Sequence, residues 1–209
     1  EDAAARVMDM ALVLHADHEQ NASTFASLVT ASTLSDIYSA VSSGVGALKG
    51  PLHGGANEAV LKMLQEIEDP KNVEAWVEDA LAKKKKIMGF GHRVYKNYDP
   101  RSRIFKEYAR KLSEKTQFSR FFHINDKLEQ VMVSKKGQHG IFPNVDLYSG
   151  IVYHQLGIAT DLFTPIFAIA RVSGWTGHVL EYWQDNRLVR PNAIYDGPPP
   201  RPYVPVSRR

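Results

Sequence analysis

Apolar residues recur at helical spacing along most of this sequence, and no segment alternates apolar and polar residues convincingly in the manner of a strand. Val7, Met10, Ala11 and Leu14, for example, share one face of a helix. Glycine, proline and capping residues separate such segments, and the sequence contains no internal repeat. The sequence therefore predicts a mostly α-helical fold.

Local start and stop signals predict where these helices begin and end. Asn72 is expected to cap a helix over 73–85, Asp99 followed by Pro100 starts another, Asn144 caps one that runs to about 156, and Asp161 caps one over 162–172. Glycines at 174 and 177 are expected to loosen the chain before a last helix to about 186, and a proline-rich tail from 191 onward is expected to be extended. Further helices are predicted over 3–14, 23–43, 56–64 and 124–133, and a loop over 134–143.

The helix predicted over 23–43 is rich in alanine and serine. Small side chains on more than one face allow another helix to approach closely, as happens in a buried helix or at a subunit interface. We therefore expect this segment in the core or at an interface.

The composition is that of an ordinary globular protein. The 209 residues are 44% hydrophobic and 23% charged, which is enough for a full core in one or two domains. The modest net charge of +3 favours a site for anionic small molecules over binding of nucleic acid. The absence of cysteine excludes disulfides and thiolate chemistry and suits the cytoplasm, and no apolar run is long enough to predict a membrane span.

His53 is the most conspicuous candidate for chemistry. Gly50 and Pro51 precede it, Gly54 and Gly55 follow it, and a predicted helix begins directly afterwards. The positive end of that helix would disfavour a second proton on the imidazole, and a neutral imidazole can donate a hydrogen bond to the oxygen of a forming enolate. The alternative interpretation, a tight turn whose histidine has only a structural role, is equally compatible with this stretch alone.

Other polar residues stand out by their position. His92 lies in a second glycine-framed segment, which on its own is only a weak dinucleotide-binding signal. Arg101 lies in the first turn of its helix, and Asp146 is expected in the first turn of another, where the helix dipole would also stabilise an aspartate with only a structural role. Arg171 ends an apolar run and needs an anionic partner.

The order and spacing of these motifs closely resemble the citrate synthase family, in its bacterial type, over essentially the whole chain. The matching motifs are Leu14-His-Ala-Asp-His-Glu-Gln-Asn-Ala-Ser-Thr24, Gly50-Pro-Leu-His-Gly-Gly-Ala-Asn57, Gly89-Phe-Gly-His-Arg-Val-Tyr95 with Asp99-Pro-Arg101, Pro143-Asn-Val-Asp-Leu-Tyr-Ser-Gly150, and Ala170-Arg-Val-Ser-Gly-Trp175 followed by Asn186-Arg-Leu-Val-Arg-Pro191.

The resemblance implies an all-α, two-domain acyltransferase of the tricarboxylic acid cycle, which condenses acetyl-CoA with oxaloacetate and hydrolyses the resulting thioester. It implies that Asp146 removes a methyl proton, that His53 hydrogen-bonds the thioester oxygen, and that His92 polarises the ketone of oxaloacetate. The residues expected to hold the dicarboxylate are His18, Arg101, Arg171 and Arg190.

The resemblance also implies the partners of the protein. It predicts a homodimer in which Arg190 enters the active site of the other subunit, CoA as product rather than as a bound cofactor, and no metal. The expected contacts to CoA are Ile87, Gly89, Phe90, Lys135, Lys136 and Asn144.

One departure concerns length. Members of the family are roughly twice as long, so the N-terminal part of the large domain is expected to be missing from this chain. The expected division is 1–54 as a large-domain segment, 55–157 as the small domain, and 158–209 as a second large-domain segment with a C-terminal arm. Exposed apolar helix faces are then expected where the missing helices would pack.

Three alternatives remain open at this point. The chain could be a 2-methylcitrate synthase that uses propionyl-CoA, because one methylene changes discrimination by only about 1–3 kcal/mol. His15, His18 and Glu19 could instead form part of a metal site in a metallohydrolase, although no third ligand at family spacing is present. The truncated chain could also be a non-catalytic helical interaction module.

Overall fold

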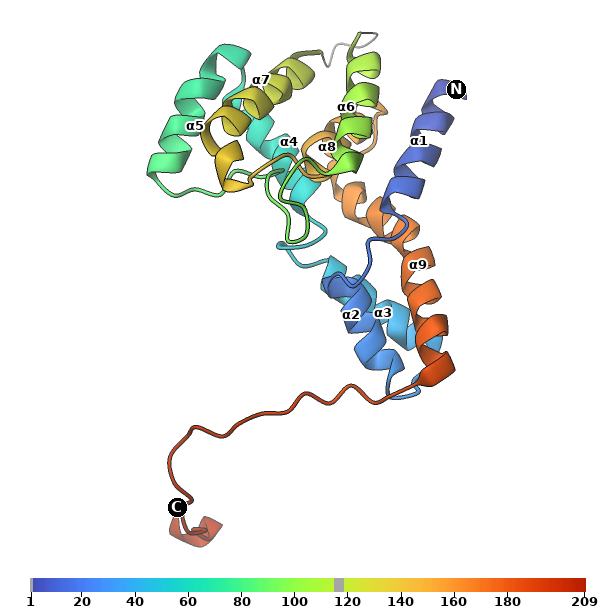
Figure 1. The fold of residues 1–209 in the computed structure, drawn as a ribbon, viewed down its shortest axis with the longest axis vertical. Coiled ribbons are helices and arrows are strands. Elements are labelled where there is room, and N and C mark those ends of the chain that lie inside the picture. The colour runs from blue at the N-terminus through green and yellow to red at the C-terminus, as the bar shows by residue number, and fades with distance from the viewer. Residues whose placement is uncertain (1, 115–118) are drawn as a thin grey trace.

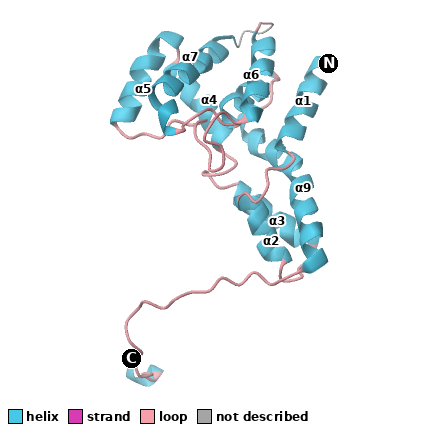
Figure 2. Cartoon of the chain, in the orientation of Figure 1, coloured by secondary structure: helices cyan, strands magenta, loops and turns pink. Residues whose placement is uncertain are grey.

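The computed structural model describes residues 2–114 and 119–209. These residues form α-helices and short 3₁₀ helices, and within them there is no strand beyond an isolated bridge between Phe90 and Pro143, as the cyan and pink cartoon of Figure 2 shows. The α-helices are α1 (Asp2–His15), α2 (Ala22–Ala31), α3 (Ile37–Leu48), α4 (Ala56–Ile67), α5 (Val73–Ala82), α6 (Pro100–Ser113), α7 (Ser119–Lys136), α8 (Asp146–Gln155) and α9 (Phe163–Tyr182). The 3₁₀ helices are η1 (Pro70–Asn72), η2 (Gly137–His139), η3 (Thr160–Leu162), η4 (Trp183–Asp185) and η5 (Val206–Arg208).

The helices gather in two groups that α9 connects (Figure 1). Helices α4 to α8 form one group, whose apolar core includes Leu64, Phe105, Ile124 and Ile151. Helices α2 and α3 pack against the C-terminal part of α9 in the other group, over smaller apolar clusters. Val7, on α1, joins the larger core. The predicted all-α architecture is confirmed, while the domain boundaries at 54/55 and 157/158 stay a prediction.

The single helix predicted over 23–43 is wrong, because the chain turns back between α2 and α3. Leu34 adopts a left-handed conformation with φ of 62°, and Asp36 caps α3 by accepting a hydrogen bond from the Ser39 N–H at 2.9 Å. The small residues do allow close packing, since the Thr30 hydroxyl on α2 donates to Ser43 Oγ on α3 at 2.7 Å. The small residues of this segment therefore do pack closely, but as two antiparallel helices joined by a turn.

Several predicted caps and breaks also differ. Asn72 donates its side-chain amide to the Ile67 carbonyl and makes no side-chain cap for α5. Asp161 lies within η3 and does not cap α9 by its side chain. Helix α9 continues through Gly174 and Gly177, so the expected loosening there is wrong. The loop predicted to begin at 134 starts later, because α7 extends to Lys136.

Other boundaries are confirmed. Helix α1 spans the predicted segment 3–14, α4 begins at Ala56, and the Asp99 carboxylate caps α6 by accepting from the Arg101 N–H at 3.0 Å. Beyond η4 the chain is extended as far as η5 and points away from the helices, as Figure 1 shows.

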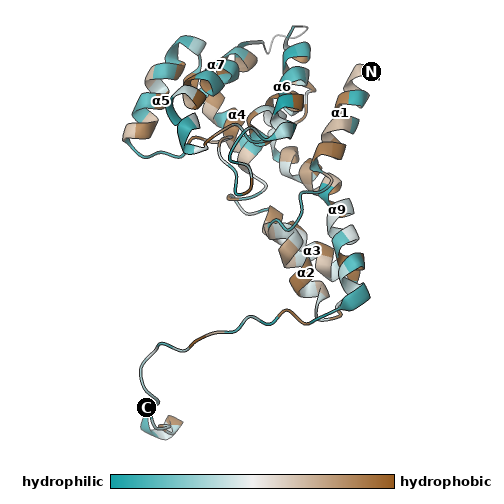
Figure 3. Ribbon diagram, viewed as in Figure 1, coloured by the Kyte–Doolittle hydropathy of each residue, from teal (hydrophilic) through white to brown (hydrophobic). Residues whose placement is uncertain are grey.

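Large apolar side chains are exposed on the helices of the second group and on α1. Figure 3 colours hydrophobic segments of these helices brown. These include Val13 on α1, Phe25 on α2, Val45 on α3, and Ile169 and Leu180 on α9. This agrees with the expectation that helix faces would be left uncovered. None of the helices in the described part of the chain is long and apolar enough to cross a membrane.

Candidate active site

One backbone and one side-chain hydrogen bond join the segment that contains Gly89 and Gly91 to the segment that contains Asn144. The Asn144 N–H donates to the Gly89 carbonyl at 2.9 Å, and the Asn144 side-chain amide donates to the Gly91 carbonyl at 3.0 Å. Gly89 has a φ of 83°, and a Cβ there would lie 2.7 Å from a methyl carbon of Leu147. This glycine therefore allows the segment that carries His92 to lie directly against the helix that carries Asp146.

Asp146 is the first residue of α8. Its carboxylate is poorly solvated and faces a cavity. Its N–H donates to Asn144 Oδ1 at 3.0 Å, whereas its Oδ1 is buried without a hydrogen-bond partner among the described residues. Burial raises the pKa of Asp146 to about 6, although the positive charge of Arg101 opposes the rise. A carboxylate with a raised pKa is a stronger base than an ordinary aspartate.

His92 is held in one tautomer by the backbone that follows it. Its Nδ1 accepts hydrogen bonds from the N–H groups of Val94 at 3.0 Å and Tyr95 at 3.3 Å. Burial, followed by the nearby His18, lowers the pKa of His92. The ring is therefore neutral at pH 7, with its proton on Nε2, and Nε2 can donate a hydrogen bond to a ligand.

His53 lies in the turn before α4, with its Nε2 2.9 Å from Ser23 Oγ. The Ser23 hydroxyl oxygen accepts from the Trp175 indole N–H at 3.1 Å, and its single proton has two acceptors in reach, His53 Nε2 and Asn21 Oδ1 at 2.7 Å. Burial and then the charge of Arg171 lower the pKa of His53, so a neutral ring is favoured by these causes rather than by the helix dipole alone. When Ser23 donates to Nε2, Nδ1 carries the ring proton, and it makes no hydrogen bond to the described residues.

Arg101 is fixed by a buried carboxylate. Its Nε donates to Asp99 Oδ1 at 3.0 Å and its Nη2 donates to Asp99 Oδ2 at 2.7 Å, and the Asp99 side chain is fully buried. Burial works to raise the pKa of Asp99, but these hydrogen bonds from Arg101 outweigh it and lower that pKa. The pair holds the guanidinium in place and leaves Nη1 for a ligand.

Arg171 is almost completely buried, and it makes no ion pair with an acidic side chain in the part of the chain that the structure describes. Its Nε donates to the His15 carbonyl at 2.7 Å, and its guanidinium lies over the Phe167 ring at 4.8 Å. Its Nη1 has no hydrogen-bond partner among the described residues, and burial lowers its pKa to about 10. A buried cationic donor without a partner is costly, so this position fits an anionic ligand.

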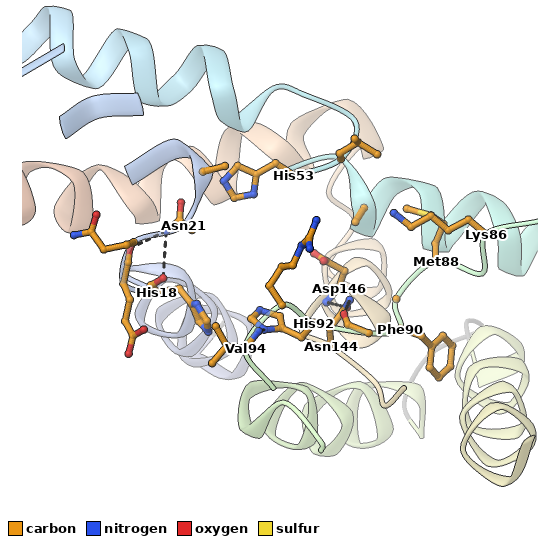
Figure 4. A pocket seen from close by; sticks show the side chains of 18 residues that line it. His18, Asn21, His53, Lys86, Met88, Phe90, His92, Val94, Asn144 and Asp146 are labelled. Carbon is orange, nitrogen blue, oxygen red and sulfur yellow. Dashed lines mark hydrogen bonds between the residues drawn. The ribbon is translucent and has the colours of Figure 1, made fainter. Parts of the chain in front are cut away.

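These groups surround one cavity. A space of about 90 Å³ is lined by His18, His53, His92, Arg101, Asp146 and Arg171. A larger cleft of about 720 Å³ shares four of these residues and extends to Lys86, Met88 and Phe90. Figure 4 looks into this cleft and shows His53 on one side, with His92 and Asp146 together on the other.

The predicted residues are not all gathered here. Gly89, Phe90 and Asn144 line the larger cleft. Ile87 is buried and does not line the cleft. Lys135 and Lys136 are in the last turn of α7 and do not line the cleft either, and Lys135 pairs with Glu78 at 2.9 Å. Arg190 is exposed on the tail, where it donates to the Pro191 carbonyl, and it does not line either cavity.

Two residues of the site were not identified from the sequence. Ser23, which orients His53, carries no local signal beyond the polar motif that begins α2. Asp99 was predicted only as a helix cap, and its bidentate contact with Arg101 depends on their positions in the first turn of α6.

His15 does not form a metal pair with His18. Its Nδ1 lies 2.8 Å from the Ala11 carbonyl, its ring packs edge-on against Phe105 and Phe167, and burial lowers its pKa to about 4. The His18 ring instead contacts His92 at a centroid distance of 5.0 Å. Within the described ranges, no three or more histidine, aspartate or glutamate side chains group as metal ligands.

Comparison with known proteins identifies the family of this chain. A family model described as "Citrate synthase, C-terminal domain" matches residues 1–192. The chain is 55% identical over 205 residues to citrate synthase of Deinococcus radiodurans, covering 98% of this chain and 54% of that protein. It is 45% identical to 2-methylcitrate synthase 1 of Corynebacterium glutamicum, with 98% and 53% covered.

Solved structures of citrate synthases have the same fold as this chain. A citrate synthase from Thermoplasma acidophilum, in a ternary complex with carboxymethyl coenzyme A and oxaloacetate, superposes with a TM-score of 0.94 at 48% identity, over 100% of this chain and 56% of that one. Citrate synthase from Thermotoga maritima gives a TM-score of 0.89 at 49% identity, over 99% and 56%. The chain thus spans about half the length of the relatives that it matches, and it belongs to the citrate synthase family.

Proposed function

We propose that the protein condenses acetyl-CoA with oxaloacetate and hydrolyses the thioester to give citrate and CoA. The observation that carries this proposal is that Asp146, His53 and His92 line the same small cavity as the guanidiniums of Arg101 and Arg171. One cavity thus combines a base, two neutral hydrogen-bond donors and two fixed cations. That combination suits an enolate-forming reaction with a dicarboxylate acceptor.

The first step is removal of a proton from the methyl carbon of acetyl-CoA. That carbon is a weak acid, so Asp146 needs a donor at the thioester oxygen, where negative charge develops. His53 supplies it through Nδ1 when the Ser23 hydroxyl donates to Nε2, which lies 2.9 Å away. The raised pKa of Asp146 makes this carboxylate a better base than one in water.

The second substrate needs cations for its two carboxylates and a donor for its ketone. Arg171 offers an unpartnered buried Nη1, and Arg101 is fixed by Asp99 with its guanidinium facing the cavity. His18 adds a further buried ring nitrogen without a partner, and His92 donates through Nε2. The methylene carbon of the enol attacks the ketone carbon, the ketone oxygen gains a proton, and water then cleaves the thioester to release CoA.

The larger cleft is the proposed place for CoA. Gly89, Phe90 and Asn144 line it, and Lys86 at its wall offers a positive charge for a phosphate. Ile87, Lys135 and Lys136 remain proposed contacts for more distant parts of the same ligand.

Turnover tests the proposal directly. The full-length protein is expected to release free thiol from acetyl-CoA only when oxaloacetate is present. Asp146→Asn should lower kcat by about 10²-fold or more, because the base is lost, while calorimetry should detect oxaloacetate binding within a few-fold of the unchanged protein. Arg171→Leu should instead abolish that binding. Near-normal turnover by Asp146→Asn would refute the assignment of the base.

Propionyl-CoA distinguishes the alternative substrate. A 2-methylcitrate synthase would have a higher kcat/KM with propionyl-CoA than with acetyl-CoA, and we expect the opposite order. Turnover by the 209-residue chain itself would rule out the remaining alternative, in which this chain is a non-catalytic helical interaction module.

A further inference from the structure

Glu129 is a buried carboxylate that has no role in the proposed reaction described above. Glu129 lies on α7 with 6% of its surface exposed. Its Oε2 accepts a short hydrogen bond from the Tyr148 hydroxyl and another from Lys106 Nζ at 3.0 Å. Lys106 also pairs with Asp126 at 2.6 Å, and both of these side chains are partly exposed, so the buried carboxylate belongs to a polar cluster that extends from the apolar core to the surface.

The partners of Glu129 lie beside the proposed catalytic residues. Tyr148 is in the first turn of α8, two residues after Asp146, and Lys106 is on α6, five residues after Arg101. Burial raises the pKa of Tyr148 well above its usual range and the charge of Glu129 adds to this, so the hydroxyl keeps its proton and donates. Glu129 therefore links the two helices whose first turns carry the base and a guanidinium.

The same face of α7 makes a second directional contact with α8. Asn125, one turn before Glu129 and fully buried, donates its side-chain amide to the Leu147 carbonyl at 2.9 Å. The two contacts of α7 therefore reach the residues immediately after Asp146. Both of them fix position along α8 as well as distance from it.

Packing alone does not require a charge here. Ile124 and Leu128 on α7 and Ile151 on α8 already belong to one apolar cluster. The ion pair gains little over apolar packing of the same volume, because the Glu129 carboxylate loses most of its hydration while Lys106 stays partly exposed. What the pair adds is direction, since its hydrogen bonds are made only in one relative placement of α6, α7 and α8.

We propose that Glu129 is a positioning residue that holds the Asp146 carboxylate in its reactive place relative to Arg101. This inference rests on the proposed condensation, because it assigns Glu129 to the same site. Misplacement of a reacting group by about 1 Å can lower a rate by roughly 10²-fold. Loss of the link should therefore lower kcat more than it weakens substrate binding.

The test compares five variants of the full-length protein. Glu129→Gln removes the charge, Tyr148→Phe removes only the hydroxyl, and the double variant removes both. Glu107→Gln is the matched control, because Glu107 is exposed and pairs with Lys111 on the outer face of α6. Ile124→Val on α7 controls for loss of stability without loss of the polar link.

We expect kcat to fall about 10-fold or more in Glu129→Gln, with a change of less than about 3-fold in the Kd of oxaloacetate. Tyr148→Phe should also lower kcat, and the double variant should be about as slow as the slower single variant, because both changes weaken the same link between α7 and α8. Glu107→Gln and Ile124→Val should keep kcat, the latter with a lower unfolding midpoint.

The outcomes separate two failures. If the unchanged protein releases no CoA, the proposed function fails and this inference falls with it. If the unchanged protein is active and Glu129→Gln matches Glu107→Gln, the inference alone is overturned. If Glu129→Gln does not fold, Tyr148→Phe decides, and a kcat equal to that of Ile124→Val would overturn the positioning role.

Discussion

Asp146 destabilises the protein that contains it. Burial raises the pKa of its carboxyl from 3.8 to about 6, so between these pH values the folded state keeps a proton that the unfolded state has released. The unfolded state then binds fewer protons than the folded state, and stability falls as pH rises through this window. Above about pH 6 the full cost of the buried charge remains.

Replacing Asp146 by asparagine should therefore stabilise the substrate-free protein at neutral pH. A shift of about two pKa units corresponds to roughly 3 kcal/mol, and the partial exposure of the side chain reduces this, so we expect a gain of about 1–2 kcal/mol at pH 7.5. The gain should vanish as pH falls toward 4.

Urea unfolding at several pH values measures this difference. Asp9→Asn, at an exposed position on α1, is the matched control for the substitution itself. Equal or lower stability of Asp146→Asn at pH 7.5 would mean that water or neighbouring dipoles solvate the carboxylate adequately.

At the scale of elements, α9 shows how a contact can override a local signal. Gly174 and Gly177 predict a weak point in the chain, yet both lie within one continuous helix. The Gly174 N–H donates to the Ala16 carbonyl at 3.0 Å, and a Cβ at this position would lie 2.4 Å from that carbonyl oxygen. A Cβ at Gly177 would meet nothing within 4 Å.

The two glycines should therefore respond in opposite ways to alanine. Gly177→Ala should raise the free energy of unfolding by about 0.5–1 kcal/mol, because alanine favours helix. Gly174→Ala should lower it by about 1–3 kcal/mol, because the new methyl displaces the segment that leads to His18. Thermal or urea unfolding of both variants measures these changes. Stabilisation by Gly174→Ala would show that the segment at Ala16 can move to make room for the methyl group.

The same contrast explains which parts of the structure the sequence could predict. The start of α6 at Asp99 and Pro100 and the place of Asp146 in the first turn of α8 follow from neighbouring residues, so they were predicted correctly. The turn at Leu34 could not be predicted from composition, because it is stabilised by the packing of α3 against α2 and not by residues near Leu34 in sequence. Ser23 was missed as a partner of His53 because the two are 30 residues apart in sequence and meet only through the fold.

At the scale of the whole molecule, the site of one chain does not contain every predicted ligand. Arg101 and Arg171 face the cavity, whereas Arg190 lies on an exposed tail beyond α9. The tail leaves the body of the molecule, as Figure 1 shows, and Arg190 lines neither cavity of its own chain. We propose that the active form is a homodimer in which each site receives Arg190 from the partner.

Subunit complementation tests this arrangement in the full-length protein. Arg190→Ala and Asp146→Asn should each be nearly inactive alone, and the two are then unfolded together and refolded as a mixture. In a mixed dimer with shared sites, one site carries both substitutions and the other carries neither. About half of the dimers formed from an equal mixture are mixed, so roughly a quarter of the normal activity should return.

The control is Arg187→Ala, at an exposed position three residues before Arg190, which should be active when it is refolded without a second variant. Refolding either inactive variant by itself should recover nothing. If Arg190 serves the site of its own chain, every site in the mixture carries one substitution, and CoA release should stay at the level of the separate variants. That result would place the tail back over its own subunit.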